Sequence, residues 1–160
     1  MADGIDFFKD RHVWVVGGSS GIGAGIGAAF KALGAVVTVT GATAAEVARA
    51  QADPELAGIS VVQLDVRSDA AVTGHIGALE RLDVLVNCAG VIRRGEELDP
   101  VVFAQVLDIN LNGSMRTCAA ARTLLAKSGG CIINTASMLS FFGGGLVPAY
   151  SASKGGVAQI

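Results

Sequence analysis

Residues 13–23 read Val13-Trp14-Val15-Val16-Gly17-Gly18-Ser19-Ser20-Gly21-Ile22-Gly23, and residues 24–33 continue in a helical pattern. An apolar β-prone run, a glycine-rich turn and a helix therefore follow one another. Glycines let a backbone turn sharply and approach an anion closely, while the free amides and the positive dipole end of the helix face that anion. This order predicts a turn that binds the pyrophosphate of a dinucleotide. The alternative is a glycine-rich turn that binds nothing.

A tyrosine and a lysine stand four residues apart in Tyr150-Ser151-Ala152-Ser153-Lys154, and Ser137 lies thirteen residues before the tyrosine. Positions i and i+4 share a helix face, so the Lys154 ammonium can lie beside the Tyr150 phenol and favour its ionised form. A phenol that acts as a general acid or base near neutrality needs that help. Alone, the pair is more typical of an ordinary helix surface. The glycine turn upstream makes it indicate carbonyl chemistry on a dinucleotide.

The spacing Gly-x-x-x-Gly-x-Gly in residues 17–23 makes a family resemblance specific. Together with Ser137, Tyr150 and Lys154, it resembles the classical short-chain dehydrogenases/reductases. The matches run from residue 13 to the end of the chain, in the order and spacing of that family. Three further segments fit the pattern: Leu64-Asp65-Val66, Asn87-Cys88-Ala89-Gly90 and Asp108-Ile109-Asn110-Leu111.

The resemblance implies a role for each matching residue. Tyr150 would give or take the hydroxyl proton of the substrate, and Ser137 would hold the carbonyl oxygen. Lys154 would assist Tyr150 and hydrogen-bond the nicotinamide ribose, and Asn110 would hold a water that relays protons outward. The implied catalytic residues are Ser137, Tyr150, Lys154 and Asn110, and the implied cofactor-binding residues are Gly17, Ser19, Ser20, Gly21, Ile22, Gly23, Asp65, Val66, Asn87, Ala89, Gly90, Tyr150 and Lys154.

Two positions depart from the family pattern. Val16 stands where the family usually has a threonine before the first glycine, and Cys88 replaces the second asparagine of an Asn-Asn-Ala-Gly segment. Both usual side chains help to tie strand ends together by hydrogen bonds, so we expect a weaker tether here. Neither change removes a catalytic group.

Apolar and helical patterns alternate along the chain. Such alternation indicates a right-handed βαβ series, and therefore an α/β fold with a doubly wound, Rossmann-type parallel sheet. The resemblance implies the strand order 3-2-1-4-5, with the cofactor across the carboxyl edge of the sheet where the order reverses. The patterns predict strands at 13–17, 35–40, 59–65, 83–87 and 130–136, and helices near 21–33, 44–51, 69–79 and 99–127, with another from about Ser151.

We expect residues 1–160 to form a single dinucleotide-binding domain. No glycine cap, basic last turn or proline closes the helix that carries Tyr150, so this helix is expected to run through residues 155–160. Family members usually continue with two more strands and a substrate-covering segment. The sequence therefore predicts a domain truncated at its C-terminus, with the fifth strand left as an apolar edge.

Composition fits an α/β enzyme, because hydrophobic residues make up 51% and aromatic residues only 5% of the chain. A net charge of −2 gives no reason to expect nucleic acid or an anionic membrane as a partner. No apolar segment is long enough to span a bilayer, and residues 1–11 lack the apolar stretch of a signal peptide. We therefore expect a cytoplasmic protein.

The cysteines and histidines do not predict a metal site. Cys88, Cys118 and Cys131 show neither paired metal-ligand spacing nor the even count of a disulfide framework, so we expect reduced, buried thiols. His12 and His75 lie far from the motifs and from each other, and surface or structural roles are expected for both.

The choice between NAD and NADP depends on the segment after the second predicted strand, residues 38–43. Gly41 and Ala42 offer neither a carboxylate for the ribose 2′-hydroxyl nor a guanidinium for a 2′-phosphate, and the glycine turn holds no Lys or Arg. A missing cation is worse for a dianionic phosphate than a missing carboxylate is for a neutral hydroxyl. NAD is therefore favoured, although the hydroxyls of Thr40 and Thr43 could meet a phosphate.

The substrate has one indication in the sequence. Arg93 and Arg94 follow the Asn-Cys-Ala-Gly turn, where the resemblance places the mouth of the site, and a guanidinium can hold a carboxylate through two parallel hydrogen bonds. The residues around these arginines and after Ser137 are similar to those of 2-dehydro-3-deoxy-D-gluconate 5-dehydrogenases. A sugar acid is thus one expected substrate class. The alternative is a pair of solvated loop arginines.

We expect an oxidoreductase that interconverts a small-molecule alcohol and ketone with NAD or NADP, and the resemblance implies a homo-oligomer, tetramer or dimer, at full length. Two other readings are weighed against it. A catalytically silent nucleotide-binding remnant would bind the cofactor without transferring hydride, and a truncated fragment would need residues absent from this sequence in order to fold. A Rossmann methyltransferase would not explain Ser137, Tyr150 and Lys154 together.

Overall fold

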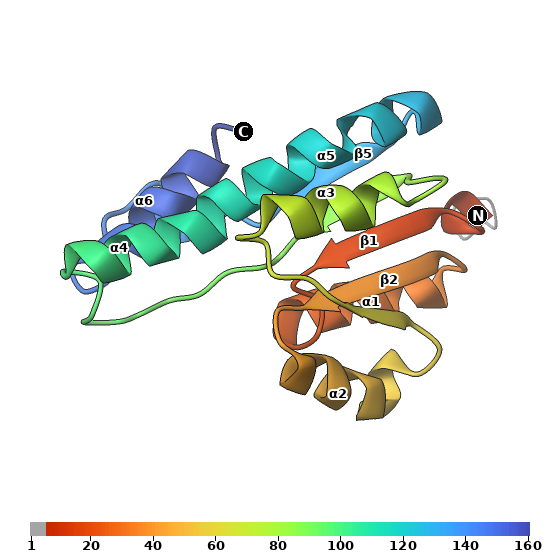
Figure 1. The fold of residues 1–160 in the computed structure, drawn as a ribbon, viewed down its shortest axis with the longest axis horizontal. Helices are drawn as coiled ribbons and strands as arrows, with labels where there is room; N and C mark the ends of the chain where they lie inside the picture. The colour runs from red at the N-terminus through yellow and green to blue at the C-terminus, as the bar shows by residue number, and fades with distance from the viewer. Residues whose placement is uncertain (1–5) are drawn as a thin grey trace.

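The computed structural model describes residues 6–160, so the first five residues of the expected domain lie outside the described part. One parallel sheet runs in the order β3-β2-β1-β4-β5, as predicted, with helices packed on both faces (Figure 1). The order reverses between β1 and β4, which leaves a crevice at the carboxyl edge of the sheet. The strands are β1 (His12–Val16), β2 (Val36–Gly41), β3 (Ser60–Gln63), β4 (Val84–Asn87) and β5 (Cys131–Asn134).

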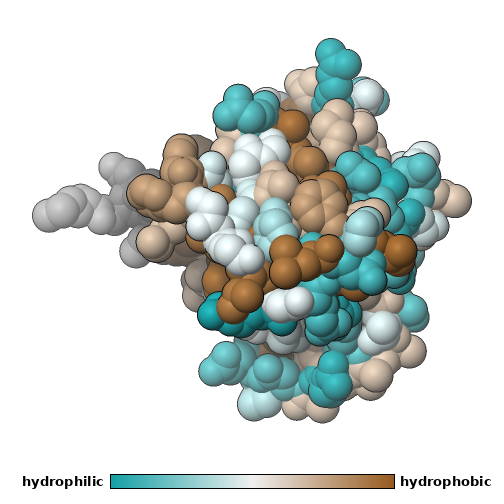
Figure 2. All heavy atoms as spheres, turned by 90° about the vertical axis from the view of Figure 1, so that its left-hand side faces the viewer, coloured by the Kyte–Doolittle hydropathy of each residue, from teal (hydrophilic) through white to brown (hydrophobic). Residues whose placement is uncertain are grey.

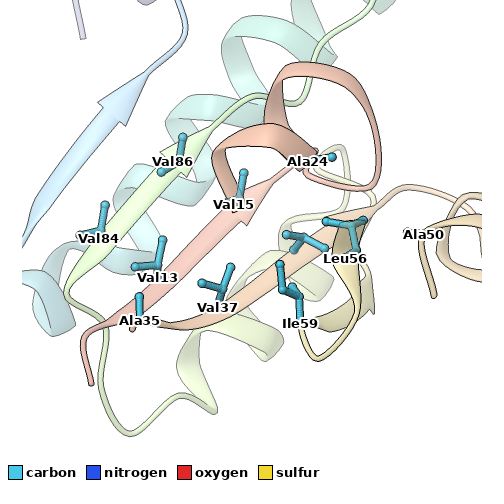
Figure 3. Packing of buried hydrophobic residues seen from close by; sticks show 11 residues of the cluster. Val13, Val15, Ala24, Ala35, Val37, Ala50, Leu56, Ile59, Val84 and Val86 are labelled. Carbon is cyan, nitrogen blue, oxygen red and sulfur yellow. The ribbon is translucent and has the colours of Figure 1, made fainter. Parts of the chain in front are cut away.

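Alternate residues of the central strand fill two separate cores. Val13 and Val15 of β1 pack on one side of the sheet with the helices α1 (Gly21–Ala32) and α2 (Ala44–Ala52), as Figure 3 shows for several members of that cluster. Trp14 and Val16 pack on the other side. Because a parallel sheet buried on both faces needs apolar residues at consecutive positions, the run of residues 13–16 reads as continuously apolar. The second core is covered by α3 (Asp69–Gly77) and α5 (Gly113–Ser128).

The long helix predicted over residues 99–127 is interrupted. The chain forms α4 (Pro100–Leu107), then a five-residue π-helical turn, η3 (Asp108–Asn112), and then α5. A π turn is wider than an α turn and is commonly found at functional sites. It places Asn110, which is completely buried, at the junction between the two helices.

The helix that carries Tyr150 differs from its prediction at both ends. α6 spans Pro148–Val157, so it begins before the expected start at Ser151 and ends before the last residues of the chain. Proline is well suited to the first helical position because the amide that it lacks would have no partner there. Tyr150 therefore lies in the first turn of α6, where backbone N–H groups still need partners.

The edge of the sheet is apolar at β5, as predicted. Ile132 and Ile133 are 39% and 43% exposed. The short 3-10 turn η4 (Met138–Ser140) follows β5, and Met138, Phe141 and Phe142 in and after it are also exposed. Apolar side chains also gather among polar ones on the side of the molecule where α4 and α6 lie (Figure 2).

The cysteines are free, but not all are buried. Cys88 and Cys118 are half-buried, and burial raises the pKa of the Cys118 thiol. Cys131 is exposed, contrary to expectation, because β5 lies at the edge of the sheet. Within residues 6–160 no cluster of side chains is suited to hold a metal ion, and none of the helices there combines the length and apolarity of a membrane span.

Candidate active site

The glycine turn between β1 and α1 is packed so closely that side chains are excluded. Gly17 has a φ of +78°, and a Cβ at this position would overlap the backbone of Ala89 at the end of β4. A Cβ on Gly23 would overlap the Gly17 carbonyl. These glycines are therefore needed for the close contact of the turn with β4 and with its own helix.

The N-terminus of α1 has free backbone donors. Ser20 is the N-cap residue, yet its side chain makes no capping hydrogen bond in the described part of the chain, and the first turn holds no acidic residue. The turn itself is held to β2, because Thr40 Oγ1 accepts from Gly17 N at 3.1 Å and the Thr40 carbonyl accepts from Ser19 N at 3.1 Å. A fixed turn with unpaired N–H groups and a helix dipole behind it suits an anion such as a pyrophosphate.

A cavity of about 470 Å³ opens in front of this turn, at the carboxyl edge of the sheet. Most of the predicted cofactor-binding residues lie along it, whereas Gly21, Asn87, Tyr150 and Lys154 do not line it. The lining also includes two residues that the sequence did not single out, Glu46 and Arg67. The predicted residues along the cavity are Gly17, Ser19, Ser20, Ile22, Gly23, Asp65, Val66, Ala89 and Gly90.

Three charged side chains, Glu46, Asp65 and Arg67, line one part of the cavity, which we call its outer wall. Glu46 accepts hydrogen bonds from the backbone N–H groups of Ala42, at 2.6 Å, and Thr43, at 3.3 Å. Arg67 binds both oxygens of Asp65, with a shortest distance of 2.6 Å. The hydrogen bond from Arg67 lowers the pKa of Asp65, so this carboxyl is ionised and neutralises the guanidinium.

Asn110 connects the loop after β4 to α6. Its Oδ1 accepts from Val91 N at 2.8 Å, and its Nδ2 donates to the Val91 carbonyl at 2.9 Å and to Ser153 Oγ at 3.1 Å. Gly90 lies beside it, because a Cβ there would come within 3.4 Å of Asn110 Oδ1 and 3.9 Å of Lys154 Nζ. Asn110 and Lys154 thus approach one another across a residue without a side chain.

Tyr150 and Lys154 share one face of α6, as their spacing predicts. Lys154 Nζ lies 5.7 Å from the centre of the Tyr150 ring and donates to the Thr135 carbonyl at 2.6 Å. The lysine is 6% exposed, and burial lowers the pKa of its ammonium group, an effect that Cys88 opposes in part. In residues 6–160 this ammonium forms no ion pair.

Ser137 is held against the same helix. It begins η4, where its Oγ accepts from Leu139 N at 3.2 Å, and Ser140 of that turn donates to the Lys154 carbonyl at 2.7 Å. The segment after β5 is therefore fixed to α6. The elements that follow β4 and β5 thus carry the four predicted catalytic side chains at the carboxyl edge of the sheet. Asn110 bonds to Ser153, the residue before Lys154, and the Ser137 turn bonds to the Lys154 carbonyl through Ser140. The Tyr150 ring lies 5.7 Å from Lys154 Nζ.

The ends of β4 and β5 are tied together despite the departure at Cys88. Cys88 Sγ lies 3.2 Å from Thr135 Oγ1, and its amide donates to the Val16 carbonyl at 2.8 Å. Asn87 is buried in the sheet, where its amide group donates to Asn134 Oδ1 at 2.9 Å and accepts from Thr117 Oγ1 at 2.7 Å. Sulfur and hydroxyl contacts therefore replace the usual amide at position 88.

The two arginines after the turn are placed differently. Both are exposed, but only Arg93 lines the cavity. Its backbone amide donates to Glu97 Oε1 at 2.7 Å. Glu97 is another residue that the sequence did not single out, and it is almost completely buried, with 1% exposure.

The site geometry agrees with a comparison of the chain with protein families. The model of the short chain dehydrogenase family matches residues 11–160. The chain belongs to this family. The resemblance seen in its motifs, and the α/β sheet expected from it, are therefore confirmed.

Individual relatives share most of the chain. It is 37% identical over 160 residues to the 2-dehydro-3-deoxy-D-gluconate 5-dehydrogenase of Bacillus subtilis, covering 95% of this chain and 63% of that protein. It is 35% identical over 166 residues to the D-threitol dehydrogenase of Mycolicibacterium smegmatis, covering 98% of this chain and 64% of that protein. The chain therefore spans somewhat less than two thirds of the length of these relatives.

Solved structures of the same fold superpose well. The ligand-free aldohexose dehydrogenase of Thermoplasma acidophilum matches with a TM-score of 0.86 and 26% identity, covering 98% of this chain and 60% of that one. A short-chain type dehydrogenase/reductase of Mycobacterium ulcerans gives 0.86 and 27%, covering 95% of this chain and 60% of that one.

Proposed function

We propose that the protein interconverts an alcohol and a ketone by hydride transfer with a nicotinamide dinucleotide, and that its substrate is a sugar acid. The observation that carries this proposal is the arrangement at the carboxyl edge of the sheet. There the first turns of α6 carry Tyr150 and a buried Lys154 ammonium, next to a cavity whose far end is a glycine turn with free N–H groups.

The cavity fits a dinucleotide. Gly17 and Gly23 leave space that a Cβ would fill, and the Ser20 side chain at the N-cap of α1 makes no capping hydrogen bond to the amides of the first turn. The turn would hold the pyrophosphate, and Asp65 and Val66, which line the cavity, would border the adenine half. When bound, the nicotinamide supplies or accepts the hydride.

The side chains of this chain would handle the proton and the substrate oxygen. Tyr150 would donate its phenolic proton to the carbonyl oxygen, or accept a proton from an alcohol, as general acid or base. The Lys154 ammonium carries the positive charge that favours the phenolate, and no carboxylate in residues 6–160 pairs with it. Ser137 would hold the carbonyl oxygen and stabilise its developing charge.

NAD rather than NADP is supported by the charges on the outer wall. Glu46, which lines the cavity, places a carboxylate next to the end of β2, where it would repel a 2′-phosphate. Arg67 is the cation on this wall, and Asp65 already binds it through both carboxylate oxygens. Thr43 uses its hydroxyl to cap α2, where it accepts from Glu46 N.

A sugar acid is supported by Arg93 and by the relatives. Arg93 is an exposed guanidinium on the lining of the cavity, on the same loop as the Asn-Cys-Ala-Gly turn. Several similar proteins are named 2-dehydro-3-deoxy-D-gluconate 5-dehydrogenase, including the one of Escherichia coli at 43% identity over 91 residues. A silent nucleotide-binding remnant is less well supported, because all four catalytic side chains are retained.

The test is a fluorescence titration with NADH and with NADPH, followed by a turnover assay on a keto sugar acid and on a neutral ketone. The protein should bind NADH at least about tenfold more tightly than NADPH and oxidise NADH only when a carbonyl substrate is present. Binding of NADH without turnover on any carbonyl or alcohol substrate would favour the silent remnant instead.

A further inference from the structure

Glu97 is a buried carboxylate that links two parts of the candidate site. It lies in the loop between β4 and α4 and is 1% exposed. Its Oε1 accepts from Arg93 N at 2.7 Å, and its Oε2 accepts from Tyr150 N at 2.8 Å, although Tyr150 is 53 positions further along the chain. One carboxylate therefore binds the backbone of the cavity-lining arginine and the backbone of the predicted catalytic tyrosine.

The contact with Tyr150 replaces a helix cap. The N-cap residue of α6 is Val147, which has no side-chain acceptor, and Pro148 follows it at the first position. Tyr150 N lies in the first turn, so its amide has no partner within the helix. The Glu97 carboxylate satisfies this amide and places a negative charge at the positive end of the helix dipole.

The burial of this carboxylate indicates that the contact is specific. A buried ionised carboxylate is unfavourable unless it is hydrogen-bonded and its charge is compensated. Within the described residues 6–160 no Lys or Arg forms an ion pair with Glu97. The two backbone amides and the helix dipole therefore compensate its charge, and a shift of either segment would remove one of its two hydrogen-bond donors.

A second contact holds the same two segments together. Gly95 N donates to the Leu146 carbonyl at 2.8 Å, just before α6 begins. The loop is also closed on itself, because Glu97 N donates back to the Arg93 carbonyl at 3.2 Å. The segments 93–97 and 146–150 therefore form one hydrogen-bonded unit with the Glu97 carboxylate at its centre.

We infer that Glu97 is a positioning residue: it sets the distance between Arg93, which would bind the substrate carboxylate, and Tyr150, which would exchange the proton at the substrate carbonyl. This inference rests on the proposed function. A substrate held at both ends reacts only if the two groups have the correct separation. Glu97 itself is 1% exposed and does not line the cavity, so its role would be exerted through Arg93 and Tyr150.

The test uses Glu97→Gln in the full-length protein. A glutamine has the same shape, but it can accept only one of the two N–H groups and sets its own NH₂ against the other. We expect kcat for a keto sugar acid to fall by about tenfold or more and its KM to rise, with the dissociation constant of NADH unchanged within about twofold. Amide hydrogen exchange of Arg93, Tyr150 or both should become at least about tenfold faster.

Asp99→Ala is the matched control. Asp99 is also a carboxylate that accepts from two backbone amides at a helix start, Val101 N and Val102 N, but it is exposed and caps α4. The Asp99→Ala variant should lose about as much stability as Glu97→Gln, but its kcat should remain that of the wild type. If Glu97→Gln does not fold, Glu97→Asp keeps the charge with a shorter reach and should show the same split between kcat and NADH binding.

The outcomes separate this inference from the proposed function. Normal kcat in a Glu97 variant whose Tyr150 or Arg93 amide exchanges faster would make the carboxylate merely structural. Unchanged exchange at both amides would show that the contact does not hold these segments. If the wild-type protein turned over no carbonyl or alcohol, the proposed function would fail, and the exchange data alone would still report whether Glu97 fixes the two segments.

Discussion

The buried charged side chains at the two edges of the central sheet differ in their partners. At the amino edge, the Asp83 side chain is 3% exposed and binds Arg11 at 2.9 Å, Arg81 at 2.9 Å and the backbone amide of His12 at 2.8 Å. At the carboxyl edge, Lys154 is 6% exposed and donates to a single backbone carbonyl. A buried carboxylate at one edge thus binds two arginines, whereas a buried cation at the other edge pairs with no carboxylate in residues 6–160.

The pKa directions express this difference. Burial alone would raise the pKa of Asp83, but the hydrogen bonds from Arg81, His12 N and Arg11 outweigh it and lower that pKa. The pKa of Lys154 is also lowered, but here the cause is burial, which disfavours the charged ammonium. Charge at the amino edge therefore stabilises the fold, while charge at the carboxyl edge opposes it. We conclude that the charged groups at the amino edge stabilise the fold, whereas the buried charge at the carboxyl edge serves the proposed chemistry.

The largest effect is expected from Tyr150→Phe, which removes only a hydroxyl at the carboxyl edge. Turnover should fall by at least about a hundredfold, the usual scale of general acid–base catalysis, because the Tyr150 phenol is the group proposed to transfer the proton at the substrate oxygen. NADH affinity and the free energy of unfolding should remain nearly unchanged. Single-turnover hydride transfer at the normal rate in this variant would rule out the role of Tyr150.

Asp83→Ala makes the corresponding change at the amino edge. It should lower the free energy of unfolding by about 2–3 kcal/mol, because the two arginines and a buried amide lose their acceptor. Both arginines are partly exposed, which keeps the loss at the lower end of values for buried pairs. Denaturant titration measures the loss. A fall in kcat per folded molecule would show that the two edges are not independent.

Arg93→Ala tests the substrate end of the carboxyl edge, with Arg94→Ala as its control. Losing a charge-assisted pair of about 2 kcal/mol should raise KM for a sugar acid by roughly 30-fold and leave a neutral ketone unaffected. Arg94 does not line the cavity, so its variant should behave like the wild type. If both substrates or both variants responded equally, Arg93 would be an ordinary solvated arginine.

Lys154→Met should change stability less than Asp83→Ala does, and in the opposite direction. The pKa of Lys154 is lower in the folded protein than in the unfolded chain, so its charge destabilises the fold below the folded pKa, and this effect disappears as pH rises to the unfolded value. The free energy of unfolding of this variant should be about 0.5–1 kcal/mol higher at neutral pH, and its turnover should be lost. Lower stability at neutral pH would contradict the assignment.

Much of this arrangement was predictable from sequence, because the parts that were predicted depend on local patterns. The apolar run of residues 13–16 and the glycine spacing predict a strand, a turn and a helix, the alternation of patterns predicts a parallel sheet, and the family resemblance implies its strand order. Thr43 and Glu46 form a capping box that could have been read from their spacing, and Pro148 is a typical first helical residue. The earlier start of α6 therefore had a signal in the sequence.

Other features have no local signature. The π turn that buries Asn110 lies in an uninterrupted helical pattern, and Asn110 bonds there to Val91 after β4 and to Ser153 of α6, which are distant in sequence. Glu97 accepts from an amide 53 positions away, a contact that no spacing rule contains. Sequence patterns describe neighbours along a helix or strand, whereas these residues are defined by contacts between elements.

The central claim is that a hydride passes between nicotinamide and substrate at the carboxyl edge of the sheet. Transfer of an isotope label tests this claim most directly. The full-length protein is incubated with NADH deuterated at the transferable position of nicotinamide carbon 4 and a keto sugar acid, and the product is analysed by mass spectrometry. The proposed function predicts one deuterium on the new carbinol carbon, and none in the same time with Tyr150→Phe. NADH consumption without deuterium in the product, or equal labelling by both proteins, would contradict it.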